Sequence, residues 1–306
     1  MKKLLPTLAA AFTALAASAS PASADSADLP AATAEAAASS AAAVAEDFSA
    51  SGDFSAAALE YRRAEADCDP RDCETRGALL VAAAESYRAC GEWDRMGRAL
   101  SRIEGDGDVR ECVEEELCFL RMRRAEGRRE WADAAEWGET LAEALAPDSP
   151  ERAAAARLAA ADWLMALEPG EARRVADGDD AATSIVDGWE ALPRKSPRVG
   201  GLLGMVPGLG YAYSGEWGNA VRSLLLNGLF GWAMYETAER DQWALFGVST
   251  FFELTWYTGS IYGGVDAAHR RNRERLEGAA DELRGRDTPA VRRVPGIDLF
   301  RVRLEF

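Results

Sequence analysis

Few side chains in this sequence have the types and spacing that catalysis requires. His269 is the single histidine, and it lies among arginines in the segment AAHRRNRER. One imidazole in such a setting is a poor general base and a poor metal ligand. The neighbouring acids Asp179 and Asp180 lie in loop-like sequence, and no Ser/His/Asp triad or metal cluster can be assembled. The sequence therefore predicts a protein that is not an enzyme and that has no catalytic residue, cofactor or metal ion.

Two polar residues inside long apolar segments are the remaining candidates for chemistry. Asn227 is eight residues before Tyr235 and Glu253 is ten after Trp243, so a helical hairpin brings the pair to roughly the same level. A carboxylate within a bilayer is costly unless it is paired or protonated. We favour a structural interpretation, a hydrogen bond that fixes helix register, because one acid with one amide makes no pathway. A proton-relay or ion-path acid is the alternative.

The apolar segments themselves predict a membrane-embedded helical hairpin. Residues 220–235 would rise only about 24 Å as a helix, whereas residues 243–265 carry a single charge and can cross about 30 Å of hydrocarbon with some tilt. The charged sequence ETAERDQ lies between them as an exposed turn. Aromatic residues bracket both segments, as interfacial anchors do: Trp217, Tyr235, Trp243, Tyr257 and Tyr262. A buried hairpin in a soluble protein is the alternative.

Residues 199–214 precede the hairpin and are also apolar, but a proline and several glycines interrupt them. A re-entrant or interfacial segment is expected there instead of a regular spanning helix. Within it lies the pattern P-G-x-G-x-x-Y-x-G, formed by Pro207, Gly208, Gly210, Tyr213 and Gly215. This pattern resembles the opening signature of small bacterial membrane modules of the TM2-like type. The resemblance implies a membrane module over residues 193–268 and no particular activity; Ala212 and the longer second helix depart from the family pattern.

The N-terminus predicts export. Residues 1–24 have two lysines, a short apolar run and an A-x-A site ending at Ala24, which are the features of a secretory signal peptide. An uncleaved anchor is the alternative. Cleavage places the mature chain in a bacterial cell envelope, with residues 25–43 as a flexible Ala/Ser leader that would tolerate a helix. The net charge of -16 disfavours a nucleic-acid partner.

An oxidising compartment makes disulfides possible for the five cysteines. Cys73 and Cys112 are 39 residues apart, nearly one repeat length, and a bridge between them is one possibility. Cys68 could instead pair with one of them, or Cys68 and Cys73 could pair across the tight segment DPRD. The spacing alone leaves the connectivity open.

Residues 44–192 contain degenerate internal repeats. The segment from Gly52 to Pro70 resembles the second helix of a tetratricopeptide repeat, with small and large residues at its packing positions: Gly52, Phe54, Ala57, Tyr61 and Ala64. Similar segments begin at Gly91 and Arg129, and a weaker one begins at Gly170. The resemblance implies an α-solenoid of six to eight helices whose concave side binds a protein partner. A scaffold whose groove is unused, or covered by the leader, is the alternative.

Residues 269–306 predict a polar helix and then a short strand. Its apolar face comprises Phe300, Val302, Leu304 and Phe306, which alternate with charged residues. A terminal Phe of this kind resembles the C-terminal recognition signal of outer-membrane β-barrel proteins, although no barrel strands precede it. A strand or extended tail that packs on the repeat domain is the alternative.

The charge distribution and the signal peptide disagree about orientation. Basic flanks would place both ends of the hairpin in the cytoplasm, whereas export places the repeat domain in the periplasm. A third crossing near Pro207 would reconcile the basic flank after the hairpin with the signal peptide and leave only the flank before it misplaced. We favour a hairpin that enters from the periplasm and returns.

The predicted fold is therefore all-α: a tetratricopeptide-like solenoid, then a membrane helical hairpin and a short C-terminal strand. We expect a scaffold in the cell envelope, anchored more readily in the inner membrane than in the outer one, which binds a protein partner in envelope assembly. An integral-membrane accessory subunit of a transport or protein-insertion system is the runner-up, and a soluble periplasmic enzyme is the weakest alternative.

Overall fold

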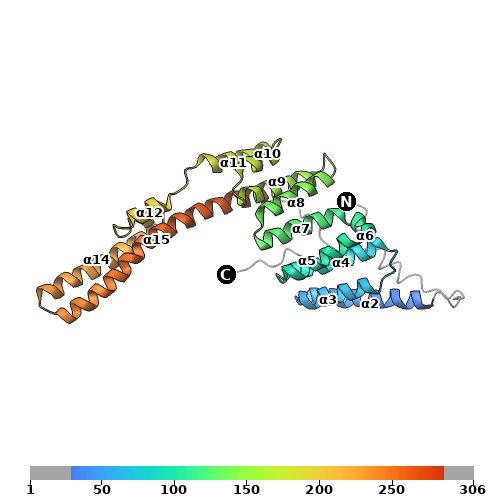
Figure 1. Ribbon diagram of the computed structural model, residues 1–306, viewed down its shortest axis with the longest axis horizontal. Coiled ribbons are helices and arrows are strands. Elements are labelled where there is room, and N and C mark those ends of the chain that lie inside the picture. Colours follow the sequence, from blue (N-terminus) through green and yellow to red (C-terminus); the bar gives the residue numbers. More distant parts are fainter. Residues whose placement is uncertain (1–28, 286–306) are drawn as a thin grey trace. The chain divides into compact units, whose positions relative to one another are not determined.

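The computed structural model describes residues 29–285, and all regular structure within that range is helical (Figure 1). The all-α prediction is confirmed for this part of the chain. The predicted signal peptide and the terminal strand of Phe300, Val302, Leu304 and Phe306 lie outside the described residues. The described chain forms two compact units, residues 29–180 with 283–285 and residues 181–282. Sequence reasoning had placed the corresponding boundary after residue 192.

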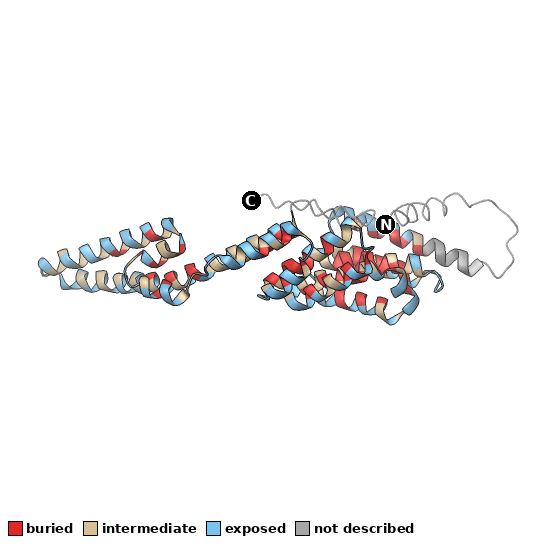
Figure 2. Ribbon diagram, turned by 90° about the horizontal axis from the view of Figure 1, so that it is seen from above, coloured by how far each residue is buried: buried red, intermediate tan, exposed pale blue. Residues whose placement is uncertain are grey.

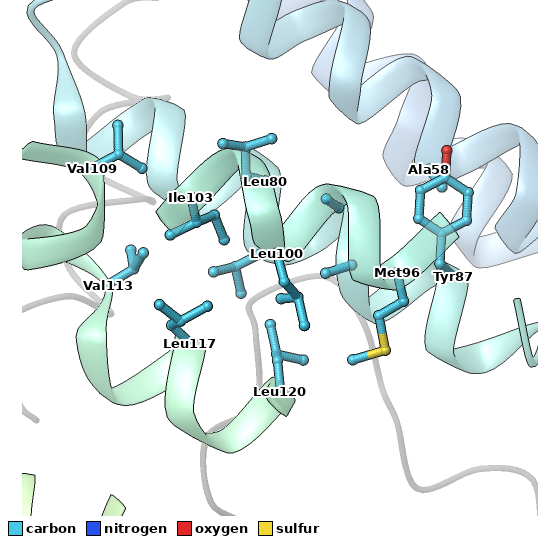
Figure 3. Close-up of a cluster of buried hydrophobic side chains, with 13 residues drawn as sticks. Ala58, Leu80, Tyr87, Met96, Leu100, Ile103, Val109, Val113, Leu117 and Leu120 are labelled. Carbon is cyan, nitrogen blue, oxygen red and sulfur yellow. The ribbon is translucent and has the colours of Figure 1, made fainter. Parts of the chain in front are cut away.

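The first unit is a series of helices in which chain neighbours pack against one another. The helices are α2 (Leu29–Ser51), α3 (Phe54–Ala66), α4 (Cys73–Ala89), α5 (Trp93–Gly105), α6 (Gly107–Cys112), α7 (Glu114–Arg128), α8 (Trp131–Ala144), α9 (Pro150–Met165) and α10 (Pro169–Val175). Their largest shared core joins α3 to α7 through side chains that include Tyr87, Met96, Leu100, Ile103 and Leu120 (Figure 3).

One type of helix-to-helix corner recurs six times within residues 29–285. In each corner a residue with positive φ follows a helix, one further residue precedes the next helix, and that helix begins at the third residue. The backbone N–H of the middle residue donates to the carbonyl five residues earlier, over 2.9–3.0 Å. This is the Schellman arrangement, which satisfies carbonyls at the end of the preceding helix. The positive-φ residues are Gly52, Gly91, Arg129, Leu167, Gly215 and Asp241.

The corners coincide with most of the predicted repeat starts. Gly52, Gly91 and Arg129 were all identified as starts from sequence, and they are the first three corners. The fourth corner is at Leu167, whereas the predicted start at Gly170 lies inside α10. Leucine occupies the αL position of this corner, so no glycine marks it in the sequence.

The Ala/Ser-rich leader is ordered where the structure describes it. Residues 29–51 form α2, so the expectation of a flexible segment does not hold from Leu29 onward. Ala41, Ala42 and Ala45 are buried against Ala57 and Tyr61 of α3. Small side chains allow this close approach of two helices, and alanine has the highest helix propensity.

The second unit contains α11 (Asp180–Ala191), α12 (Pro197–Leu203), α13 (Leu209–Ser214), α14 (Trp217–Glu239) and most of α15 (Trp243–Arg284). The stretch predicted to be re-entrant forms the two short helices α12 and α13, which Pro207 and Gly208 separate. The predicted hairpin helices 220–235 and 243–265 lie within α14 and α15. The polar helix expected from residue 269 is not separate, because α15 continues without a break to Arg284.

Candidate functional site: an exposed apolar hairpin on a glycine-lined base

Helices α14 and α15 lie side by side and are joined by a turn of three residues at 240–242. Two contacts fix their register: Ser223 Oγ donates to Ser260 Oγ over 3.1 Å, and the rings of Phe230 and Phe252 stack with centroids 5.7 Å apart. We refer to this pair, from Trp217 to Tyr262, as the hairpin. Between residues 29 and 285, no helix combines the length and the apolar character needed to cross a membrane.

Much of the hairpin is exposed (Figure 2), and its exposed residues include an unusual number with large apolar side chains. Their exposed fractions run from 44% for Phe252 to 75% for Tyr262. Folded soluble monomers rarely expose a contiguous apolar surface on this scale. The fifteen residues are Trp217, Val221, Leu224, Leu225, Leu229, Trp232, Tyr235, Trp243, Leu245, Val248, Phe251, Phe252, Leu254, Trp256 and Tyr262.

Exposed aromatic residues mark both ends of this surface. Trp217 and Tyr262 lie near the base, and Tyr235 and Trp243 lie near the turn. From Trp217 to Tyr235 is 18 residues, or about 27 Å of helix, and from Trp243 to Tyr262 is 19 residues, or about 28 Å. These separations are close to the roughly 30 Å of hydrocarbon in a bilayer.

A few polar side chains lie between the two helices. Asn227 is buried, and its Nδ2 donates to the Ser223 carbonyl over 2.7 Å. Ser260 Oγ, which Ser223 contacts, also accepts from the backbone N–H of Gly208 over 3.3 Å. Asn227 thus bonds within α14, whereas Ser223 and Ser260 make the bond between the two helices, and the role of Asn227 as a register residue stays a prediction.

Glu253 does not join this chain of hydrogen bonds. With Phe230 opposite Phe252 and Ser223 opposite Ser260, Asn227 lies level with residues 255–256, roughly 4 Å along the axis from Glu253. Glu253 Oε2 and Asn227 Oδ1 are both enclosed, and neither has a hydrogen-bond partner within the described chain. The structure thus brings the predicted pair to within about one turn of each other without a bond between them.

The P-G-x-G-x-x-Y-x-G pattern forms the base of the hairpin. A Cβ on Gly210 would lie 2.6 Å from the Gly200 carbonyl oxygen and 2.8 Å from Gly264 Cα, so backbone of α12 and α15 occupies the space of a side chain. Gly208 has φ of +88°, and a Cβ there would lie 2.4 Å from the Ala220 carbonyl oxygen. These positions require glycine because three helices meet at backbone distance.

The other members of the pattern end and tie down α13. Gly215 has φ of +87° and supplies the αL residue of the corner before α14. The Tyr213 hydroxyl accepts a hydrogen bond from the Ser196 backbone N–H over 3.0 Å, and the Lys195 ammonium lies 4.6 Å from the Tyr213 ring centroid. Pro207 stands directly before Gly208 in the loop between α12 and α13, where a missing N–H does not interrupt a helix. The pattern is therefore an architectural element of the hairpin base.

Charged groups brace the same end of the hairpin. Arg270 on α15 donates from Nε and Nη2 to the Glu216 carboxylate, over 3.0 and 2.9 Å, and also pairs with Asp266. The Arg270 guanidinium lowers the pKa of Glu216, which caps the start of α14. Asn219 Nδ2 donates to the same carboxylate over 2.6 Å. These contacts hold the first turn of α14 against α15.

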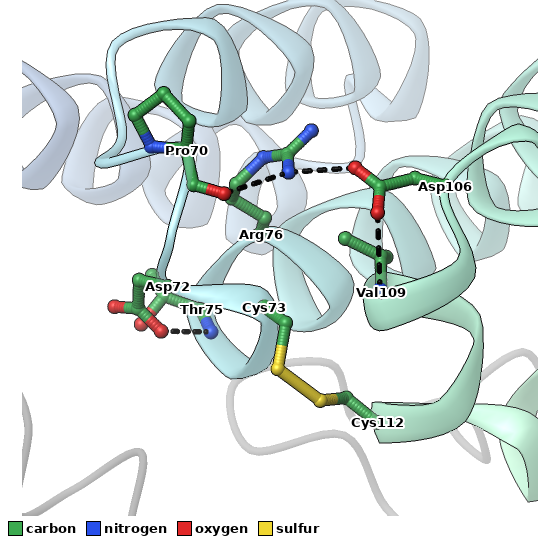
Figure 4. The surroundings of a disulfide bond; sticks show 8 residues. All are labelled: Pro70, Asp72, Cys73, Thr75, Arg76, Asp106, Val109 and Cys112. Carbon is green, nitrogen blue, oxygen red and sulfur yellow. Dashed lines mark hydrogen bonds and ion pairs between the residues drawn. A yellow bond between two sulfur atoms is a disulfide. The ribbon is translucent and has the colours of Figure 1, made fainter.

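In the first unit the structure selects one of the open cysteine pairings. Cys73, at the start of α4, is bonded to Cys112, at the end of α6 (Figure 4). Cys68, Cys90 and Cys118 are unbonded, and burial raises the pKa of the Cys68 and Cys118 thiols to about 11. High thiol pKa values disfavour the reactive thiolate.

Arg76 reinforces the disulfide region. Its guanidinium donates to Asp106 Oδ2 over 2.8 Å and to the Pro70 carbonyl over 3.2 Å (Figure 4). It also donates to the buried Glu65 carboxylate over 3.1 Å. The Arg76 hydrogen bond lowers the pKa of Asp106, whose carboxylate also accepts from the Val109 backbone N–H. One cation thus links α3, α4 and the start of α6.

Sequence reasoning missed a fully buried acid, Asp162, in the alanine-rich helix α9. Asp162 Oδ1 accepts from Arg284 Nη2 over 2.9 Å, and the Arg284 guanidinium lies 6.0 Å from the Trp131 ring centroid. Burial, together with the nearby Glu126, raises the pKa of Asp162 to about 7, although Arg284 and Arg123 oppose that rise. The only sequence signal was a single acid among the alanine and leucine residues on the buried face of α9.

Other sequence candidates do not come together into a reactive site. His269 is exposed on α15, and Asp180 begins α11 directly after Asp179. Within the part of the chain that the structure describes, no group of three or more His, Cys, Asp or Glu side chains is placed to hold a metal ion. That the chain is not an enzyme stays a prediction.

Comparisons with protein-family models, with curated proteins and with solved structures find no match for this chain. The resemblances to tetratricopeptide repeats and to TM2-like modules stay predictions.

Proposed function

We propose that this protein is a scaffold of the bacterial cell envelope, in which the hairpin seats in lipid and the preceding helices bind a protein partner. The observation that carries the proposal is the exposed apolar surface of α14 and α15. Placing fifteen partly exposed large side chains in an apolar phase is worth on the order of 10 kcal/mol, at roughly 1 kcal/mol each. A binding energy of that size is enough for stable anchoring.

Two further features support lipid as the apolar phase. Exposed aromatic residues lie at both ends of the surface, and such rings prefer the interface between hydrocarbon and water. Their spacing of about 27–28 Å along the helices is close to the thickness of bilayer hydrocarbon. A protein partner would not require this spacing.

The repeat domain supports the scaffold part of the proposal. Its helices pack in chain order and are joined by the recurring corner, an arrangement that in a tetratricopeptide-like solenoid displays one continuous surface to a peptide. The Cys73–Cys112 disulfide fits an exported domain in the periplasm, because disulfides persist in oxidising compartments. In this proposal, photo-crosslinkers placed along exposed positions of α3, α5 and α8 in living cells capture one recurrent envelope protein.

The lipid part is tested by two pairs of substitutions that each place glutamate at exposed apolar positions. Leu225→Glu with Phe251→Glu places two charges on the exposed hairpin surface, whereas Val44→Glu with Leu59→Glu places two charges on exposed apolar positions of the repeat domain. We expect the hairpin variant to lose flotation with lipid vesicles and the control variant to float as the parent chain does. Equal flotation of both variants would contradict the proposal.

Glu253 favours a second candidate function. An enclosed carboxyl oxygen without a partner is an expected feature of an acid that works in a membrane transport or insertion system, in which this chain would be an accessory subunit. Glu253→Gln keeps the shape of the side chain and removes the acid. If Glu253→Gln abolishes the activity of the protein in the cell while the repeat surface is intact, the accessory role is favoured. If that activity is retained, the scaffold is favoured.

A further inference from the structure

Two basic segments that are far apart in the sequence meet at the base of the hairpin. Asn272 on α15 makes reciprocal hydrogen bonds with the backbone of Lys195, accepting from its N–H and donating to its carbonyl, each over 2.8 Å. Arg275 Nη1 donates to the Pro193 carbonyl over 2.9 Å. These bonds hold residues 193–198 alongside residues 271–275, so two basic flanks that are separate in the sequence lie together.

The joined segments carry six basic residues and one acid, Glu274. We call this set the basic collar: Arg194, Lys195, Arg198, Arg271, Arg273 and Arg275. Arg198 and Arg273 are exposed, and Arg271 is exposed with Glu274 as a distant partner at 3.7 Å. Arg270 is not counted, because Glu216 and Asp266 already neutralise it.

The collar is a local exception in an acidic protein. The chain as a whole has a net charge of -16, and the turn at the other end of the hairpin carries Glu236, Glu239 and Asp241 against Arg240. Charge therefore changes sign along the hairpin. A cluster of cations directly below an apolar surface is the arrangement that attracts anionic headgroups to juxtamembrane segments.

The position of the collar fits the headgroup layer. Arg271 is nine residues beyond Tyr262, about 14 Å along α15, and helical side chains tilt toward the N-terminus of their helix. On α15 that direction points back to the aromatic residues at the hairpin base. The guanidinium groups can thus reach the layer that borders the hydrocarbon, with their stems along the helix surface.

We propose that the basic collar binds the phosphate groups of anionic phospholipids at the bilayer surface. The inference rests on the proposed seating of the hairpin in lipid and adds a lipid class to it. The hairpin supplies apolar insertion that is indifferent to headgroup charge, and the collar supplies a preference for anionic membranes that depends on salt.

The test is flotation of the full mature chain with vesicles of phosphatidylcholine alone and of phosphatidylcholine with phosphatidylglycerol. The collar variant carries Arg198→Gln, Arg271→Gln and Arg273→Gln. The control carries the same loss of charge on exposed arginines of the repeat domain, as Arg71→Gln, Arg98→Gln and Arg110→Gln. Amide exchange of the hairpin peptides establishes that each variant is folded.

We expect the parent chain and the control to partition more strongly into anionic than into neutral vesicles, and 0.5 M salt to remove the difference. Because each arginine near such a surface contributes about fivefold, the three changes of the collar variant should cost on the order of 100-fold in partition to anionic vesicles and nothing in partition to neutral ones. A parent chain that binds both vesicles equally would overturn the collar and leave the hairpin proposal standing. A parent chain that binds neither would overturn both.

Discussion

Replacing Gly210 by alanine should separate α13 from the helices that surround it. A Cβ at this position would lie 2.6 Å from the Gly200 carbonyl oxygen, 2.8 Å from Gly264 Cα and 3.1 Å from Gly204 Cα. All three atoms belong to backbone, so no side chain can turn away to make room. Overpacking of this kind costs about 1–3 kcal/mol, and the gain in helix propensity offsets at most about 1 kcal/mol of it.

Gly228 provides the matched control, since a Cβ there would meet nothing within 4 Å. The same change of glycine to alanine in the middle of α14 should stabilise the helix by about 0.5–1 kcal/mol. The same change of glycine to alanine is therefore expected to destabilise the structure at position 210 and to stabilise it at position 228.

The assay is amide hydrogen exchange of the full chain in lipid or detergent, read on peptides that cover residues 197–215. Gly210→Ala should lower the free energy of local opening there by about 1–2 kcal/mol, and Gly228→Ala should leave it unchanged. If Gly210→Ala protects these peptides as well as the parent does, the close helix contacts assigned to the P-G-x-G pattern are wrong.

Three other predictions concern the disulfide, the buried acid and the hairpin acid. Replacing Cys73 and Cys112 by serine removes a link that closes a loop of 39 residues, so denaturant unfolding of the first unit should show a loss of about 4 kcal/mol, and added reductant should give the same loss in the parent. Because burial raises the pKa of Asp162 to about 7, the folded chain retains a proton that the unfolded chain releases near pH 4. The unfolding free energy should therefore fall as pH rises from about 4 to about 7, by at most about 4 kcal/mol, and Asp162→Asn should flatten that profile; an unchanged profile would contradict the assignment. Glu253→Gln should leave vesicle flotation unchanged, because the hairpin surface rather than its acid provides anchoring, and reduced flotation would refute this.

The sequence predicted features that arise from short-range patterns. Helical composition without strand-like runs gave the all-α class, and the resemblance to tetratricopeptide repeats gave the starts at Gly52 and Gly91, where glycine precedes an acid and an aromatic residue. These signals are local because a Schellman corner needs a residue that tolerates positive φ, and the following helix needs a cap. The same corner at Leu167 was placed three residues late because leucine carries no such signal.

Two expectations drawn from local composition differ from the structure. A change from apolar to polar residues near His269 predicted a boundary, yet α15 continues because no proline or capping glycine interrupts it between Trp243 and Arg284. The Ala/Ser-rich leader similarly became helix α2, whose small side chains find a partner in α3.

The remaining features depend on tertiary contacts, which the spacing of residues along the sequence does not reveal. Whether Cys73 bonds Cys112 or Cys68 is decided by how α4 and α6 pack. Gly210 must be glycine because the backbone of Gly200 and of Gly264 approaches it from other helices. The basic collar forms because Asn272 and Arg275 hold residues 193–195 against α15.

The central claim is that lipid surrounds the hairpin, and extraction of cell membranes with alkaline carbonate tests it most directly. The account predicts that the full chain stays in the membrane pellet after extraction and enters solution only with detergent. Release of the chain into the aqueous fraction as a monomer, without detergent, would contradict it.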